Sequence, residues 1–97
     1  MYKVENLIKD QSFNKLKVEK IKTSEALDIL SISLEKGMVF PEHNAPRDAH
    51  LIMLEGKIRF HIMHEVYTLS RYQHFNFEKD QPHWVEAIEN SKFLIVR

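Results

Sequence analysis

The feature that most constrains the fold of this chain is a series of short segments in which apolar and polar residues alternate. Ile58, Phe60 and Ile62 alternate with polar neighbours, which is the pattern of a strand with one buried face. Similar extended segments are expected at residues 15–21, 26–34, 49–54, 66–69, 75–77, 84–88 and 93–96. Strands that recur about every ten residues, without a long helix, predict an all-β fold: a small antiparallel β-barrel or jelly roll.

Turn-forming residues predict how these segments are connected. Residues 41–48 contain two prolines, an Asn and an Asp, so this stretch is expected to be a loop. Gly37 has the position of a turn residue, and Glu55-Gly56 is expected to close a hairpin between the segments on either side of it.

The chain is short enough to be treated as one domain, because 97 residues supply one hydrophobic core and hardly two. The domain is therefore expected to span residues 1–97. Val4, Leu7 and Ile8 have spacings that suit one or two helical turns. Residues 1–11 are accordingly expected to form a short helix or an arm at the start of the barrel.

The charge balance and the absence of cysteine exclude several kinds of partner and site. Fourteen basic residues balance fourteen acidic ones, so there is no net field to hold nucleic acid or an anionic membrane surface. No apolar run approaches the roughly 20 residues of a membrane span, and no export signal is visible. With no cysteine, disulfides and thiolate sites are excluded, and a soluble, cytoplasmic protein is expected.

Glycine-dependent catalytic motifs are also missing. The chain has two glycines, too few for most phosphate-binding loops or nucleophile elbows, and it has no His-Glu-x-x-His sequence. The common nucleotide-binding, hydrolase and zinc-protease classes are therefore not expected.

The six histidines differ in their positions relative to the expected strands. His61 lies on the polar phase of its strand and His64 in a predicted turn, so both are expected to face solvent. His74 starts a strand and could face either way. His43 and His83 each adjoin a proline-containing loop and precede a strand that should enter the barrel, which makes them the candidate site residues.

These two histidines fall within motifs that resemble those of the cupin superfamily. The first motif comprises Gly37, five residues, His43, a loop, a short apolar strand and Leu54-Glu55-Gly56. The second begins at Pro82-His83, continues through Val85 and Ala87, and ends with the strand at 93–96. The resemblance spans residues 29–97, and it implies a cupin barrel and, as in many small cupins, a homodimer.

The resemblance also implies a metal site, of which this chain keeps only part. Metal-binding cupins carry two histidines and a glutamate in the first motif and one histidine in the second. His43 and His83 match the first and last of these ligands, whereas Ala45 and Ala49 stand where the other two would be. The second motif also lacks its usual glycines.

His50 is the only further histidine near these positions, and its role depends on the strand register. Counting back from Gly56 places the missing ligand at Ala49, which points His50 to the other face of its strand. If a bulge turned His50 inward, His43, His50 and His83 would form a three-histidine site with an open position, suited to zinc or iron. Otherwise His43 and His83 face each other across the barrel mouth, hydrogen-bonded or bridged by water.

Three functions follow from these alternatives. The leading one is a small-molecule-binding protein with a degenerate, weak metal site, whose pocket would be lined by His43, Phe75, Phe77, His83 and Trp84, although aromatic residues in a small barrel are more often plain core. The second is a metal-dependent dioxygenase or isomerase that uses the three histidines and a divalent ion: iron, zinc, nickel or manganese. The third is a non-catalytic sensory or interaction module that works as a dimer.

Overall fold

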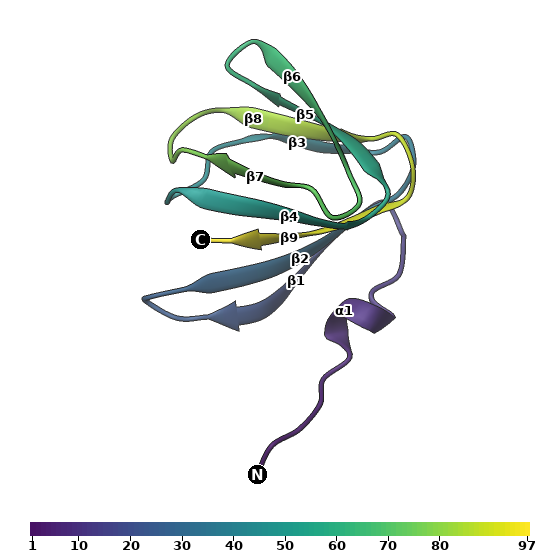
Figure 1. Ribbon diagram of the computed structural model, residues 1–97, viewed down its shortest axis with the longest axis vertical. Coiled ribbons are helices and arrows are strands. Elements are labelled where there is room, and N and C mark those ends of the chain that lie inside the picture. Colours follow the sequence, from purple (N-terminus) through teal and green to yellow (C-terminus); the bar gives the residue numbers. More distant parts are fainter.

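The computed structural model describes residues 1–97 as two antiparallel β-sheets that face each other, preceded by one short helix (Figure 1). The five-stranded sheet has the order β1-β2-β9-β4-β7, and the four-stranded sheet has the order β3-β8-β5-β6. The elements are α1 (Leu7–Asp10), β1 (Leu16–Thr23), β2 (Asp28–Leu34), β3 (Val39–His43), β4 (Ala49–Glu55), β5 (Lys57–Ile62), β6 (Glu65–Ser70), β7 (His74–Phe77), β8 (His83–Ala87) and β9 (Ser91–Val96).

The alternation along the strands fills the space between the two sheets. On β5, Ile58, Phe60 and Ile62 are buried and face the opposite sheet. Burying side chains of this size stabilises the fold by about 1.5–3 kcal/mol each. The core contains Ile32, Leu34, Ala45, Ala49, Leu51, Met53, Ile58, Phe60, Ile62, Leu69, Phe77, Val85, Ala87, Phe93 and Ile95. The all-β barrel expected from the sequence is confirmed.

The expected loop at residues 41–48 is wrong in its first part, because β3 continues through Pro41 to His43. Proline has no N–H to donate to a ladder, and it is tolerated in a strand at a sheet edge. β3 is such an edge strand, since it pairs only with β8, and its register shifts between Phe40 and His43. The proline alone predicts a break in the strand, and only the position of β3 at the sheet edge shows why the strand continues.

The hairpin expected at Glu55-Gly56 is also wrong. β4 pairs with β7 and β9 in one sheet, whereas β5 pairs with β6 and β8 in the other. Gly56 is thus the corner where the chain passes between sheets, and its φ of +87° favours glycine. The actual hairpin joins β5 to β6 through Met63 and His64, which both have positive φ angles, as a tight type I′ turn requires.

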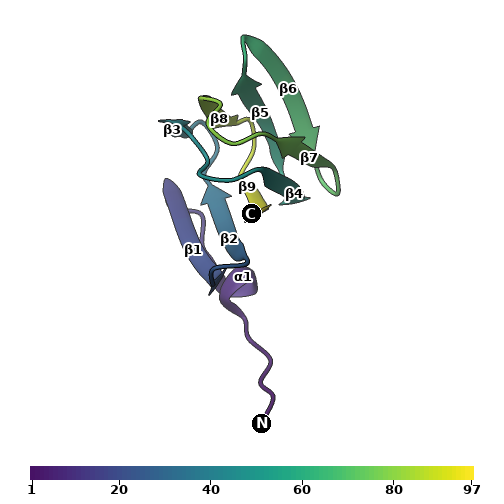
Figure 2. The same ribbon diagram turned by 90° about the vertical axis from the view of Figure 1, so that its left-hand side faces the viewer.

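The N-terminal segment packs on the outer face of the five-stranded sheet. α1 leads into Gln11, which is buried and donates its side-chain amide to the carbonyl oxygens of Ser31 and Lys17. The Ser31 hydroxyl in turn donates to the Gln11 amide oxygen at 2.6 Å. Residues 1–6 are exposed and extend away from the barrel (Figure 2). α1 is the only helix, and no helix here has the length and apolar character needed to cross a membrane.

The two glycines allow a matched test of the corner at Gly56. A Cβ at this position would overlap the Asn90 carbonyl oxygen and Ser91, whereas a Cβ at Gly37 would meet open space at a similar φ of +84°. Gly37→Ala is expected to lower the free energy of unfolding by about 1 kcal/mol, from backbone strain alone. Gly56→Ala adds overpacking and should cost about 3 kcal/mol. Urea unfolding measures both, and equal losses would contradict the close contact at the corner.

Candidate functional site

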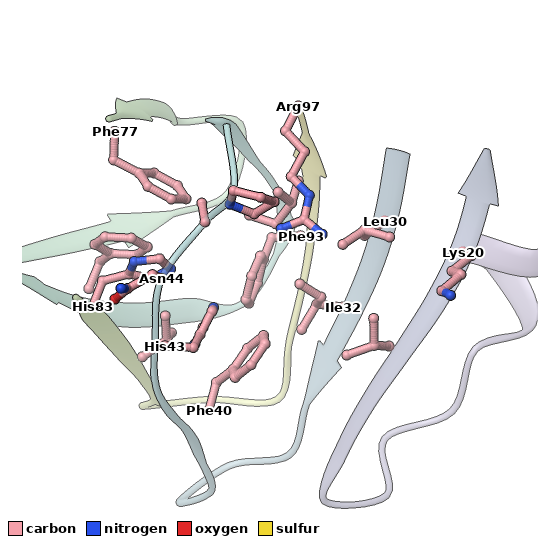
Figure 3. Close-up of a pocket in the computed structure, with 16 residues that line it drawn as sticks. Lys20, Leu30, Ile32, Phe40, His43, Asn44, Phe77, His83, Phe93 and Arg97 are labelled. Carbon is pink, nitrogen blue, oxygen red and sulfur yellow. The ribbon is translucent and has the colours of Figure 1, made fainter. Parts of the chain in front are cut away.

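A cavity opens between the two sheets at the end of the barrel where β3 ends and β8 begins (Figure 3). Its volume is about 380 Å³, and ten of its sixteen lining residues are hydrophobic. Side chains from both sheets form its apolar walls: Ile32, Phe40, Phe60, Val85, Phe93 and Ile95. An apolar concavity with few polar groups is the usual form of a small-molecule site.

His43 and His83 are brought together at this cavity. They are direct partners in the antiparallel pairing of β3 with β8. Their ring centroids lie 4.2 Å apart, with the ring planes at 63°. Both residues line the cavity. They thus meet at the barrel mouth, where the sequence predicts that they lie.

Each of the two rings is held by a hydrogen bond to the carbonyl oxygen two residues before it in the chain. The Nδ1 atom of His43 lies 2.7 Å from the Pro41 carbonyl oxygen, and the Nδ1 atom of His83 lies 2.9 Å from the Gln81 carbonyl oxygen. A carbonyl oxygen only accepts, so each Nδ1 must carry the proton and donate it. In the neutral rings, each Nε2 is therefore left with a free lone pair, ready to accept a hydrogen bond or to bind a metal.

His83 is kept neutral by its surroundings. It is 3% exposed, and its ring stacks on Phe60 and packs at an angle against Phe77. Burial lowers the pKa of His83 below its usual 6.5, and a positive charge on His43 would lower it further, whereas the hydrogen bond to Gln81 acts in the opposite direction. At neutral pH the ring is thus an uncharged acceptor inside an apolar cavity.

The remaining positions of the metal site implied by the sequence motifs supply no ligand. Ala45 and Ala49 are both buried, and Ala45 lines the cavity with a methyl group. Asn44 is the only other neutral polar side chain of the lining. No group of three or more His, Asp or Glu residues converges anywhere in the structure. Metal sites in enzymes generally use three protein ligands, so these residues do not fit a resident metal of the kind that the motifs imply.

His50 does not join the pair, so the three-histidine site does not form in this structure. Leu51, its neighbour on β4, is fully buried, which leaves His50 on the outer face of the five-stranded sheet. There its Nε2 atom lies 3.0 Å from the Nδ1 atom of His74. His74, whose direction the sequence left open, is exposed on β7. No bulge in the pairing of β4 with β7 turns His50 inward.

Two of the three aromatic residues expected in the pocket lie elsewhere. Phe77 lines the cavity, whereas Phe75 packs beside it against Phe60 and Tyr67. Trp84 points to the outer face of β8, because His83 and Val85 on either side of it point inward.

Trp84 belongs to a separate cluster on that outer face. Its ring stacks flat on His61 at 3.6 Å, and the Nε2 atom of His61 lies 3.2 Å from a Glu86 carboxylate oxygen. Arg59 donates to the other oxygen of the same carboxylate at 2.8 Å, and this hydrogen bond is the main reason that the pKa of Glu86 is lowered. His61 thus faces outward, as expected, and is partly covered.

Sequence reasoning missed Phe40, Lys20 and Arg97 as cavity residues. Lys20 had a usable signal, since it shares the phase of Leu16 and Val18 on β1, and that phase faces the cavity. Pro41 interrupts the strand pattern next to Phe40, so the sequence did not indicate that Phe40 lies on a strand. Nothing in the alternation marked Arg97, which follows the last strand.

Comparisons with known proteins place this architecture among solved structures. In sequence comparisons, no protein-family model and no curated protein matches this chain. A conserved protein of unknown function from Streptococcus pyogenes is 26% identical, with a TM-score of 0.85 over 99% of this chain and 86% of that one. An RmlC-like cupin from Desulfovibrio desulfuricans is 25% identical, with a TM-score of 0.83 over 99% and 95% of the two chains.

A cupin superfamily protein from Desulfitobacterium hafniense shares the fold at lower identity. It is 15% identical, with a TM-score of 0.82 over 90% of this chain and 80% of its own. Each of these matches spans most of both chains, so the likeness covers the whole barrel. The structure therefore has the cupin barrel fold, as the two sequence motifs indicated.

The burial of His83 predicts a pH dependence of stability. Below about pH 6.5 the unfolded chain binds a proton at His83 that the native state, with its lowered pKa, does not. The free energy of unfolding should therefore fall as the pH is lowered from about 6.5 to the native pKa. His83→Gln should flatten this fall in urea unfolding between about pH 7 and pH 5, whereas the exposed control His64→Gln should not. Equal slopes in the two variants would contradict the burial of a neutral His83.

Proposed function

We propose that this protein binds a small molecule in the barrel, with the ligand in contact with His43 and His83. The observation that supports this most directly is the pair of imidazoles, each held by a backbone carbonyl, at a largely apolar cavity. In each ring Nδ1 already donates to a backbone carbonyl, so a ligand can donate hydrogen bonds to both Nε2 atoms. The apolar body of such a ligand fills the rest of the space.

The cavity limits the size of such a ligand. A volume of about 380 Å³ lies at the small end of ordinary ligand sites. It suits a single ring with short substituents better than a nucleotide or a lipid. The aromatic side chains of Phe40, Phe60 and Phe93 offer flat apolar surfaces for such a ring.

The proposal includes only weak binding of a divalent metal. Iron, zinc, nickel or manganese would find two imidazole nitrogens here, with alanines at the other two expected ligand positions. We therefore propose that a divalent metal binds only weakly, and that the dioxygenase or isomerase alternative lacks the ligand it needs from His50.

A homodimer stays a proposal, and one observation supports it. Met1, Tyr2 and Val4 are at least 86% exposed on an N-terminal segment that also carries Lys3 and Glu5. Such side chains suit a contact with a second copy.

Two probes of nearly equal shape test the ligand proposal. We expect para-cresol, a ring with a hydroxyl donor, to bind in the cavity and to perturb the NMR signals of His43, Phe60 and His83. Toluene lacks the donor and should bind about fivefold more weakly, because one hydrogen bond is worth about 1 kcal/mol. In His83→Phe the difference between the probes should shrink. Perturbations confined to other surfaces, or no binding of either probe, would contradict the proposal.

A further inference from the structure

The charged residues of the cavity are of one sign. Lys20 and Arg97 are the only charged side chains in its lining, and no carboxylate lines it. Elsewhere the chain is balanced, with fourteen basic and fourteen acidic residues. The lining of the cavity therefore carries positive charge, which Asp28, a residue outside the lining that pairs with Arg97, offsets only in part.

These two cations lie across the cavity from the histidine pair. Lys20 is on β1 and Arg97 follows β9, so both come from the five-stranded sheet. His43 and His83 are on strands of the four-stranded sheet. Figure 3 shows the histidines on one side of the cavity, with Arg97 and Lys20 toward the other and Phe93 and Ile32 between them.

The Arg97 guanidinium is incompletely satisfied. Its Nε atom lies 3.6 Å from an Asp28 carboxylate oxygen, a distance too long for a hydrogen bond. That Nε atom is buried and has no hydrogen-bond partner. A guanidinium has five N–H donors in a fixed fork that matches a carboxylate, and Asp28 takes up only part of this capacity.

We infer that the ligand is an anion: a small molecule with a carboxylate for Arg97 and Lys20, an apolar ring or short chain, and a hydrogen-bond donor for His43 and His83. This inference rests on the proposed function and adds the chemical class of the ligand. Hydroxylated aromatic carboxylic acids meet all three requirements. Amines are disfavoured, because a further positive charge would face Lys20 and Arg97, and the lining itself holds no carboxylate. Asp28, outside the lining, offsets only part of the Arg97 charge.

Two isosteric probes test the anionic character. The test compares the binding of 4-hydroxyphenylacetate with that of 4-hydroxyphenylacetamide, which has the same ring and hydroxyl but no charge. The carboxylate is expected to bind about tenfold more tightly at low salt. This preference should shrink as salt is added, since the mouth of the cavity is open to solvent.

Substitutions around the mouth of the cavity are expected to lower or to raise the preference for the carboxylate probe over the amide probe. Lys20→Gln and Arg97→Gln should each reduce the preference for the carboxylate, and Arg97→Lys should retain most of it. Asp28→Asn should increase the preference, because Arg97 then shares its charge with no other group. Lys22→Gln is the matched control, since it removes the same charge from the same strand at an exposed position outside the cavity.

The outcomes separate this inference from the proposed function. If both probes bind in the cavity with equal affinity, the anionic ligand is excluded and small-molecule binding stands. If neither these probes nor para-cresol binds, the proposed function itself fails. If Lys22→Gln lowers the preference as much as Lys20→Gln does, the effect is one of overall charge, and the assignment of Lys20 is overturned.

Discussion

The antiparallel pairing of β3 with β8 places His43 opposite His83, and the chemistry of the cavity depends on this pairing. Each strand ends or begins at its histidine, so each ring can bond the carbonyl oxygen two residues earlier in the chain. These bonds fix both protons on Nδ1. Burial lowers the pKa of His83 and keeps its ring uncharged, so its Nε2 atom is a hydrogen-bond acceptor at an apolar cavity.

The same barrel could hold a metal only if further ligands faced this pair. The buried methyl groups of Ala45 and Ala49 occupy the positions that would supply them, and His50 points to the other face of β4. Because apolar and aromatic side chains rather than metal ligands line most of the cavity, its lining suits an organic molecule better than a metal ion. Lys20 and Arg97 come from the opposite sheet and add positive charge to the lining of the same cavity.

The sequence was sufficient for the strands with clear alternation, because the alternation can be seen within each segment. It was also sufficient for the meeting of His43 with His83, because the two motifs contain these residues in the expected order. It was insufficient where the answer depended on which strands pair. A proline such as Pro41 would break a central strand, but an edge strand tolerates it. A glycine such as Gly56 can lie in a hairpin turn or at a corner between sheets, and which of the two it forms depends on the sheet that the next strand joins. Trp84 was expected in the cavity as a neighbour of His83, yet adjacent residues on a strand face opposite ways. Gln11, buried against Ser31, had no signal in the alternation.

The protonation of the two histidines is the most direct test of this arrangement, and long-range ¹H–¹⁵N NMR correlations on the protein near neutral pH measure it. We expect the Nδ1 atom of both His43 and His83 to carry a proton, and the ring of His83 to be uncharged. An Nδ1 atom without a proton in either ring would contradict the hydrogen bonds to Pro41 and Gln81. A charged His83 at this pH would contradict its burial in the apolar cavity.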